Sequence, residues 1–371
     1  MLIYFALIVW AFLGGKLLHT QTDRHGKLLF TVVSAFLLVF TAGLRAKTVG
    51  CDTAQFVENC FGYAQKNGWG TLFQTGYEPG FMAFCKVLTA ISPNPQILTF
   101  ASSLLIYPIF CMFIHRNSTD VGKSLFFFLT LDGFATFLNV MRQAMAIAVL
   151  LFGVEIFLKR KKRLGFLGTV LIAFTLHKSA LLGILFLGFR FVKCNVFTLL
   201  ALAVSGIALA FGGNIVFRLV AKIFPAYGGY VGQEAFWHIG AGITFAVYAS
   251  FVVLALTFSE RRLRPLGKNP LFRMDAAEEA LSKEYVLLCA ACGVALSFAG
   301  VRYTMFLRLV YYFLPFIYLS AEYALNRAYQ KVPVLAPWIE LFAYAGAFTY
   351  FTFLHLVRPE WYAIVPYSFF F

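Results

Sequence analysis

A short polar segment carries the residues of this chain that are best suited to chemistry. Arg45-Ala46-Lys47-Thr48-Val49-Gly50-Cys51-Asp52-Thr53 directly follows an apolar run, residues 28–44, that is long enough to cross a bilayer. Cations and a carboxylate at that depth have left the hydrocarbon but still face the lipid headgroups. Such a site suits a lipid-linked substrate that bears phosphate. Asp52 is a candidate general base or a partner that orients Arg45; the structural alternative is that it caps a helix over residues 54–65.

Arg142 and Gln143 form a second candidate pair, at the start of the apolar run 144–158. A guanidinium beside the free amides of a helix N-terminus adds its charge to the positive end of the helix dipole, which favours anion binding. The structural alternative is an arginine that snorkels to the outer headgroups. Because the positive-inside bias disfavours arginines at an outer boundary, the sequence favours a substrate contact at Arg142.

Glu78 and His177 add an acid and an imidazole to the candidate residues. Glu78 precedes Pro79, so it either takes part in the site or only marks the start of a helix over residues 79–91. His177 ends an apolar run and is either a satisfied core histidine or a titratable group that lines an outer cavity. The residues alone do not decide whether Asp52 or His177 is the base.

Two arginines and a tyrosine complete the candidate set. Arg302 and Arg308 are six positions apart, roughly 120° around a helix, so they share a cavity only if it is wide or if Arg302 precedes the helix. A cation one or two turns inside a span is costly to keep without a ligand, which favours Arg308. Tyr230 lies in an aromatic, glycine-containing loop, whose rings either stack on sugars or form an interfacial belt.

Several kinds of chemistry have no matching pattern in this sequence. There is no metal-ligand spacing, no Asp-x-Asp and no nucleotide-binding glycine loop, so we expect neither a metal nor another cofactor. The basic residues fall in short clusters between apolar runs, which disfavours nucleic acid as a partner. What remains suits a lipid pyrophosphate, because arginines can neutralise that anion without a metal. Cys51 and Cys60 can pair in an oxidising compartment, but nothing in the sequence requires it.

The composition predicts the kind of protein that positions these residues. Of 371 residues, 61% are hydrophobic and 13% are charged, against about 25% charged in soluble domains. We therefore expect an all-α polytopic membrane protein that interacts with membrane lipid. The apolar runs predict about twelve transmembrane helices, at residues 2–19, 28–44, 97–115, 121–139, 142–158, 164–176, 179–192, 195–212, 241–258, 285–301, 304–325 and 335–355.

The charges predict how these spans are oriented. The formal charge is +15, from 31 Lys and Arg against 16 acids. If residues 79–91 form a re-entrant or interfacial helix and do not cross, the basic clusters collect on one face, as expected of a cytoplasmic face. Both termini and the candidate site residues then lie at the outer face, with Arg308 one to two turns into the membrane below Arg302. We expect a single integral membrane domain over residues 1–371, with outer loops at 45–96 and 213–240 and a cytoplasmic loop at 259–284.

Short motifs carrying the candidate residues follow one another in a definite order. They are Gly43-Leu44-Arg45, Val49-Gly50-Cys51-Asp52-Thr53, Glu78-Pro79-Gly80-Phe81, Arg142-Gln143-Ala144-Met145-Ala146, His177-Lys178-Ser179-Ala180, and Arg308 ahead of Tyr311-Tyr312-Phe313 and Pro315. In this order and spacing the chain resembles the EpsG family of Wzy-type polysaccharide polymerases. Two positions depart from the family pattern: Lys178 stands where the family often has Pro, and Cys51 stands at a position that is usually small or polar.

The resemblance implies a fold and an activity. The fold is akin to the GT-C class of multispanning glycosyltransferases, in a bacterial inner membrane with the active site facing the exterior. The substrates are oligosaccharide units linked to undecaprenyl pyrophosphate, for exopolysaccharide, capsule or O-antigen. Arg142 and Arg308, with Arg302 or Arg45, are expected to bind the donor pyrophosphate. A chain-length regulator and a flippase are the expected protein partners. The alternatives are an O-antigen-type ligase, a glycan flippase or transporter, and a membrane acyltransferase.

Overall fold

In the computed structural model, the described residues are 1–72, 74–224, 228–229, 231–232, 236–259 and 280–371. Regular structure in this part of the chain is helical, and an isolated antiparallel bridge joins Arg45 to Phe369. The prediction of an all-helical membrane protein is therefore confirmed. Contacts divide the chain into two compact units, of which the first comprises mainly Met1–Leu187 and Pro337–Phe371 and the second Gly188–Asp275 and Leu281–Ala336.

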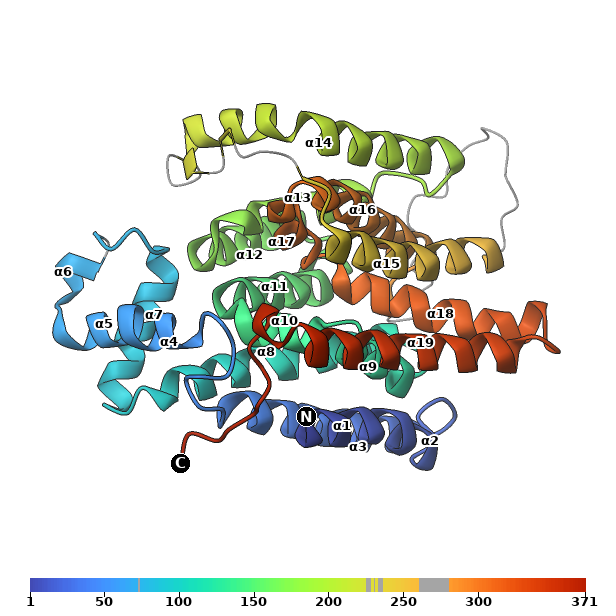
Figure 1. Cartoon of the computed structure of the whole chain (residues 1–371), viewed down its shortest axis with the longest axis horizontal. Coiled ribbons are helices and arrows are strands. Elements are labelled where there is room, and N and C mark those ends of the chain that lie inside the picture. Colours follow the sequence, from blue (N-terminus) through green and yellow to red (C-terminus); the bar gives the residue numbers. More distant parts are fainter. Residues whose placement is uncertain (73, 225–227, 230, 233–235, 260–279) are drawn as a thin grey trace. The chain divides into compact units, whose positions relative to one another are not determined.

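The first unit contains three kinds of helix, of which the α-helices keep the labels of Figure 1. The α-helices are α1 Leu2–Val9, α2 Gly15–Leu17, α3 Arg24–Gly43, α4 Thr53–Gln55, α5 Gly62–Lys66, α6 Trp69–Leu72, α7 Pro79–Ile91, α8 Gln96–Asn117, α9 Val121–Thr130, α10 Gly133–Asn139, α11 Met141–Gly153, α12 Arg163–Leu176 and α19 Ala336–Val357, with α13 Ile184–Phe189 at its boundary. The π-helical segments are Trp10–Gly14, Phe56–Phe61 and Val154–Leu158. The 3-10 segments are Lys178–Gly183 and Pro359–Trp361.

The second unit is built mainly on four long helices. They are α14 Val196–Ile223, α15 Ile239–Phe258, α16 Lys283–Arg302 and α18 Leu314–Lys331, with the shorter 3-10 segment Thr304–Phe306 and α17 Leu307–Val310. Polar caps begin two of them, because Asn195 accepts from the Thr198 amide at 2.9 Å and Ser282 accepts from the Tyr285 amide at 3.3 Å.

The expected number of twelve spans is not what the helices support. Six described helices are long and apolar enough to cross a membrane, or up to eight if two bent pairs each count as one span. The bent pairs are α9 with α10, at 57°, and residues 304–310 with α18, at 68°. Residues 2–17, 79–91, 163–176 and 178–189 form apolar helices of fewer than 18 residues. Apolar runs reveal hydrophobicity but not breaks, so counting the runs overestimates the number of full spans.

The first unit has two chemically different ends. At one end, Lys27 donates to the Ser118 carbonyl at 2.8 Å and Lys123 pairs with Glu340 at 2.9 Å. We call this the basic end; it also holds Arg24, His115, Arg116 and Lys159. From there α3, α10 and α12 lead to the other end, the Arg45 end, which holds Arg45, Asp52, Glu78, Asn139, Arg142 and His177. The short helices α4 to α7 gather at this end (Figure 1, left).

Both ends of the chain lie at the Arg45 end of the first unit. The Tyr4 hydroxyl, near the N-terminus, donates to the Ile364 carbonyl at 2.9 Å. The Gly50 amide donates to the Ala363 carbonyl at 2.8 Å, and the Ala46 amide to the Ser368 carbonyl at 2.9 Å. Within this unit both terminal segments therefore contact the surroundings of the Arg45 segment.

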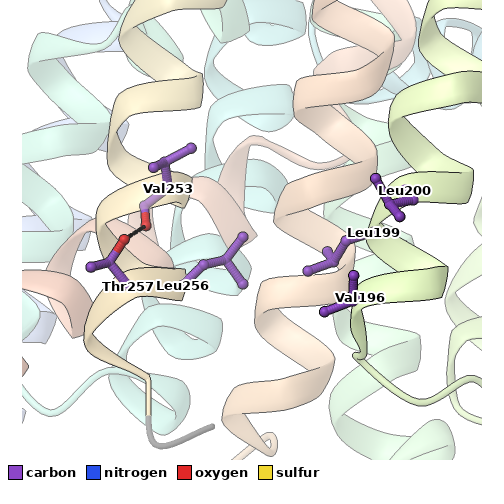
Figure 2. A pocket seen from close by; sticks show the side chains of 6 residues that line it. All are labelled: Val196, Leu199, Leu200, Val253, Leu256 and Thr257. Atoms are coloured by element: carbon purple, nitrogen blue, oxygen red, sulfur yellow. Dashed lines mark hydrogen bonds between the residues drawn. The ribbon is translucent and has the colours of Figure 1, made fainter. Parts of the chain in front are cut away.

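The second unit carries an apolar groove of about 370 Å³ (Figure 2). Val196, Leu199 and Leu200 enter it from α14, and Val253, Leu256 and Thr257 enter it from α15. The Thr257 hydroxyl already donates to the Val253 carbonyl at 2.8 Å, so its proton is satisfied. The groove lies toward the C-terminal end of α15, whereas Trp237 and His238 precede that helix. Its lining side chains are aliphatic except for Thr257.

One of the expected loops differs from the described chain. The outer loop was expected to begin at residue 213, but α14 continues to Ile223. The reason is packing, because Phe217 lies against Ala299, Tyr303 and Phe306 and makes this extra segment part of the core. Most of the expected cytoplasmic loop 259–284 falls outside the described residues.

Candidate functional site

Arg45 is almost fully buried, at 2% exposure, just after the last turn of α3. Its guanidinium donates to the Ala42 carbonyl, and to the Leu138 carbonyl at 3.1 Å. The first bond satisfies a free carbonyl at the C-terminal end of a helix, and the second ties α3 to the end of α10. We expected Arg45 to contact phosphate; in this structure its two terminal nitrogens donate to backbone oxygens, and its Nε has no hydrogen-bond partner among the described residues.

The loop that follows Arg45 is held against the end of α10. The Cys51 amide donates to Asn139 Oδ1 at 2.5 Å, and Asn139 Nδ2 donates back to the Ala135 carbonyl at 2.9 Å. Gly50 has a φ of +95°, and an added Cβ would lie 2.8 Å from the Thr53 hydroxyl and 3.2 Å from the Leu138 carbonyl. Glycine is therefore required for this close approach.

Asp52 sits at the end of this loop and is half-buried. It occupies the N-cap position of α4, but its side chain accepts no capping hydrogen bond. The structural alternative for Asp52, a capping role, is thus absent from the structure. Its backbone carbonyl accepts from the Phe56 amide at 3.1 Å, so Asp52 stands one turn before the π-helical segment Phe56–Phe61. Segments of this kind occur frequently at functional sites.

Arg142 lies at the start of α11 and is enclosed by an acid and aromatic rings. Its Nη1 pairs with Glu78 Oε2, and their side chains are 21% and 8% exposed. The guanidinium carbon lies 5.0 Å from the Tyr77 ring centre, 5.1 Å from Phe56 and 5.9 Å from Phe81. Rings at these distances attract a cation through their electron-rich faces. Arg142 Nε is buried without a hydrogen-bond partner among the described residues, so the guanidinium retains donor capacity.

Glu78 links Arg142 to the turn at His177. Its Oε1 accepts from the Lys178 amide at 3.3 Å. A proline at position 178, which the family often has, has no amide hydrogen and could not make this bond. Gly80 allows α7 to approach the same turn, because an added Cβ would lie 2.2 Å from the Thr175 hydroxyl oxygen.

His177 caps the 3-10 segment Lys178–Gly183 through its ring. Nδ1 accepts from the Ser179 amide at 3.3 Å and lies 2.7 Å from the Ser179 hydroxyl oxygen. An amide can only donate, so Nδ1 must hold its lone pair toward it. In the neutral ring the proton then resides on Nε2, which makes that nitrogen a donor.

The structure therefore brings five sequence-predicted positions of the first unit to one end. Glu78, Arg142 and the His177 turn are in direct contact, and Asp52 is joined to Arg142 through Phe56. Arg45 supports the same end from its interior. Gln143, the neighbour of Arg142, is also interior, at 1% exposure.

The remaining predicted positions belong to the second unit or lie outside the described residues. The Arg302 guanidinium carbon lies 4.9 Å from the Phe211 ring centre and 5.4 Å from that of Trp237. Arg302 ends α16, whereas Arg308 is an exposed residue of α17, so the two arginines stand on separate helices. Tyr230 is outside the described residues. The expectation that Arg302 or Arg308 joins Arg142 on one pyrophosphate stays a prediction.

Sequence reasoning missed the aromatic side chains around Arg142. Phe81 stands in a motif that carries the family resemblance, Phe56 follows Thr53 by three residues, and Tyr77 directly precedes Glu78, yet none of them was assigned a role. The available signal was their position beside charged candidates. Asn139 also gave a signal, because it is a polar residue just before Arg142 at the end of an apolar run.

Cysteine thiols also lie at the Arg45 end. Cys51 is exposed, Cys60 is buried, and both thiols are free, so the pairing that an oxidising compartment would allow is not formed. Burial raises the pKa of the Cys60 thiol to about 11, against a smaller lowering by Arg142. No group of three or more His, Cys, Asp or Glu side chains that could hold a metal ion occurs among the described residues.

This arrangement has a definite chemical capacity. Arg142 offers a fixed positive charge with an unsatisfied donor, which suits a phosphate oxygen. Asp52 offers a carboxylate that accepts no capping hydrogen bond from the described chain, which suits acceptance of a proton. Three aromatic rings lie close to the guanidinium, and their low polarity strengthens its electrostatic interactions.

Comparison with known proteins gives one match. No curated protein and no solved structure gives a significant match to this chain. The model of the EpsG family matches residues 28–369, which is nearly the whole chain and includes every candidate residue named above. With the fold and the Arg45 end as described, the resemblance of its motifs is confirmed: the chain belongs to the EpsG family.

Proposed function

We propose that this chain is a Wzy-type polymerase that joins lipid-linked oligosaccharide units into an exopolysaccharide. The observation that carries the proposal is Arg142, held by Glu78 and three aromatic rings at the Arg45 end of an EpsG family member. The donor is a growing glycan on undecaprenyl pyrophosphate, and the acceptor is the non-reducing hydroxyl of a fresh lipid-linked unit. The architecture is GT-C-like, and the reaction uses neither a metal nor another cofactor.

The orientation we propose places the Arg45 end outside a bacterial inner membrane. The basic end of the first unit supports it, because cytoplasmic segments carry the excess of Lys and Arg. Lipid-linked units must then reach the outer face, which requires a flippase, and a separate partner would set chain length. The sugars of the polymer are those of the lipid-linked unit that the cell supplies.

Arg142 binds the donor pyrophosphate and stabilises it as the leaving group. The acceptor oxygen attacks the anomeric carbon while the bond from that carbon to the pyrophosphate oxygen breaks. The additional negative charge that develops on the departing pyrophosphate is met by a guanidinium already oriented by Glu78, so little reorganisation is needed. Glu78 pairs with only one nitrogen of the Arg142 guanidinium, so the remaining donors can bind phosphate. Glu78 can keep its hydrogen bond from the Lys178 amide at the same time.

Asp52 accepts the proton from the acceptor hydroxyl. His177 is less suited to this role, because its Nδ1 lone pair is used by the Ser179 amide and its Nε2 carries the proton. We assign His177 as a hydrogen-bond donor that orients substrate. This choice between two open candidates rests on the direction of one hydrogen bond.

A deletion strain complemented with single variants tests the proposal. Arg142→Ala and Asp52→Asn should each lower the amount of full-length polymer by about 100-fold or more, the scale for loss of one charge-stabilising or proton-accepting group. Lys47→Ala is the matched control, because Lys47 lies in the same loop but forms only an exposed pair with Glu58. Membrane levels of each variant are measured alongside by immunoblot.

Glycan length distinguishes the alternatives in the same strains. Accumulation of single lipid-linked units indicates a lost polymerase, whereas altered decoration of normal-length polymer indicates an acyltransferase. Absence of all surface glycan indicates a flippase or a ligase. Full-length polymer from normally expressed Arg142→Ala and Asp52→Asn would refute the site.

A further inference from the structure

The first unit contains a buried acid–imidazole pair that the proposed reaction does not use. His355 Nε2 lies 3.2 Å from Asp132 Oδ1, and the two side chains are 0% and 1% exposed. The rings of Phe351 and Tyr362 pack around His355, at 4.5 Å and 5.3 Å between centres. Two ionisable groups in such surroundings cost desolvation energy, so their presence indicates a structural or functional role.

Asp132 stands at the break between α9 and α10. Its φ of +59° is left-handed, which aspartate tolerates better than most residues. The two helices meet there at 57°, and the Asp132 carbonyl restarts the helix by accepting from the Thr136 amide at 2.8 Å. Asp132 therefore lies at the bend that sets the direction of α10. Its contact with His355 fixes this bend and thereby the position of the other end of α10.

That other end of α10 holds one side of the Asp52 loop. Asn139, the last residue of α10, accepts from the Cys51 amide at 2.5 Å. Because α10 is only seven residues long, a shift at Asp132 is transmitted directly to Asn139.

The segment after His355 holds the other side of the same loop. The Ala363 carbonyl accepts from the Gly50 amide at 2.8 Å, and the Cys51 thiol lies 3.5 Å from the Trp361 carbonyl and 3.6 Å from that of Glu360. Thus the two elements that grip residues 50–52 are the two elements that the Asp132–His355 contact joins. The contacts form a closed ring around the candidate base.

We propose that Asp132 and His355 are positioning residues that fix α10 against α19 and thereby hold the Asp52 loop in place. The pair acts through the loop and does not touch substrate. Its effect on polymer rests on the proposed function, but its effect on the loop does not. A measurement of the loop itself therefore separates failure of this inference from failure of the proposed function.

Cys51 provides that measurement, because it is an exposed thiol within the loop. In a Cys194→Ser background, alkylation of Cys51 by a membrane-impermeant maleimide is followed by gel shift on the full-length protein. His355→Phe keeps an aromatic ring but removes the donor, and should raise the alkylation rate by about tenfold, the scale for loss of one charge-assisted hydrogen bond. His355→Gln keeps a side-chain donor and should restore a rate near that of the parent.

A matched control lies on the same helix. Glu340, at the start of α19, pairs with Lys123 at 2.9 Å at the basic end. Glu340→Gln breaks an ion pair of α19 without touching the loop, and should leave the Cys51 rate unchanged. If His355→Phe does not accumulate, the double variant Asp132→Asn with His355→Phe removes the unpaired buried carboxylate and should show the same faster alkylation.

Polymer assays on the same variants add a second readout. His355→Phe should lower turnover while leaving the KM for lipid-linked units nearly unchanged, since the pyrophosphate contact at Arg142 is intact. Faster alkylation with His355→Phe and its reversal with His355→Gln support the inference. An alkylation rate equal to that of the parent in folded His355→Phe, or in the folded double variant, overturns it.

Discussion

Each end of the first unit contains a buried glutamate, and the two glutamates differ in how completely they are satisfied. Glu155, at the basic end, has a fully buried side chain and pairs with Lys159 at 2.8 Å and Arg116 at 3.6 Å. It also accepts from Asn117 Nδ2 at 2.7 Å. Glu78, at the Arg45 end, meets Arg142 and one backbone amide.

The difference lies in the cations as much as in the acids. Lys159 is only 5% exposed and pairs with Glu155, which Arg116 and Asn117 also contact, so the Glu155 carboxylate is saturated by neighbouring side chains. Arg142 is 21% exposed and keeps an unpartnered Nε, with aromatic rings in place of further acids. We infer that a saturated ion pair stabilises the fold, whereas an incompletely satisfied one at a chain end rich in loops can serve a substrate.

Replacing each glutamate by glutamine is the strongest test of this difference between Glu155 and Glu78. Glu155→Gln leaves Lys159 buried beside a neutral group and should cost about 3 kcal/mol of stability, so little folded protein accumulates. The activity of each folded molecule should stay near that of the parent. Glu78→Gln should accumulate well, because Arg142 is partly exposed, but should lower polymer formation by about tenfold through a poorly oriented guanidinium.

Quantitative immunoblots, detergent-solubilised melting curves and polymer yields per folded molecule check these outcomes. Glu58→Gln is the control, because Glu58 forms an exposed pair with Lys47 and should change neither quantity. If Glu155→Gln lowered the activity of each folded molecule more than Glu78→Gln did, the distinction between structural and substrate-binding ion pairs would fail.

A second, smaller effect is expected at Arg45, the other arginine of this end. Arg45→Lys keeps the charge but cannot donate to the Ala42 and Leu138 carbonyls at once, because an ammonium lacks the fork of a guanidinium. One buried carbonyl is left unsatisfied, which should cost about 2 kcal/mol and lower the melting temperature. Polymer yield per folded molecule should remain near the parent level.

Arg142→Lys is the matched variant for Arg45→Lys in the same assays. It should lose activity with little change in the melting temperature, because the partly exposed chain can relax. Equal losses of activity in Arg45→Lys and Arg142→Lys would instead assign both arginines to the substrate.

The sequence predicted the helical class, the two ends of the first unit and most of the residues gathered at the Arg45 end. Charge and hydropathy are enough for this, because basic residues segregate to one side of a membrane and polar residues mark the ends of apolar runs. The order of the family motifs, from Arg45 to Pro315, also agreed with the family match over residues 28–369.

What the sequence could not predict depends on backbone geometry. The burial of Arg45 follows from where the Leu138 carbonyl lies, and no pattern in the sequence reports that position. The bend at Asp132 is likewise invisible, since residues 121–139 read as one apolar run. The assignment of Asp52 over His177 needed the direction of the bond from the Ser179 amide to the ring.

The smallest expected effect concerns the charge of Asp52 and tests its place beside Cys51. Burial raises the pKa of the Cys51 thiol, and the Asp52 carboxylate raises it further. Asp52→Asn removes only the second cause, so the pKa should fall, the thiolate fraction at neutral pH should rise, and alkylation should be faster. The gain should be less than about tenfold, the change that a full pKa unit would give.

In the Cys194→Ser background the whole curve of rate against pH should shift to lower pH in Asp52→Asn and stay in place in Glu58→Gln. A His355→Phe variant should instead raise the rate at every pH without moving the curve, because loosening of the loop exposes the thiol while leaving the Asp52 charge present. An unchanged curve in Asp52→Asn would mean that the carboxylate is turned away from the loop, and would remove it as the candidate base.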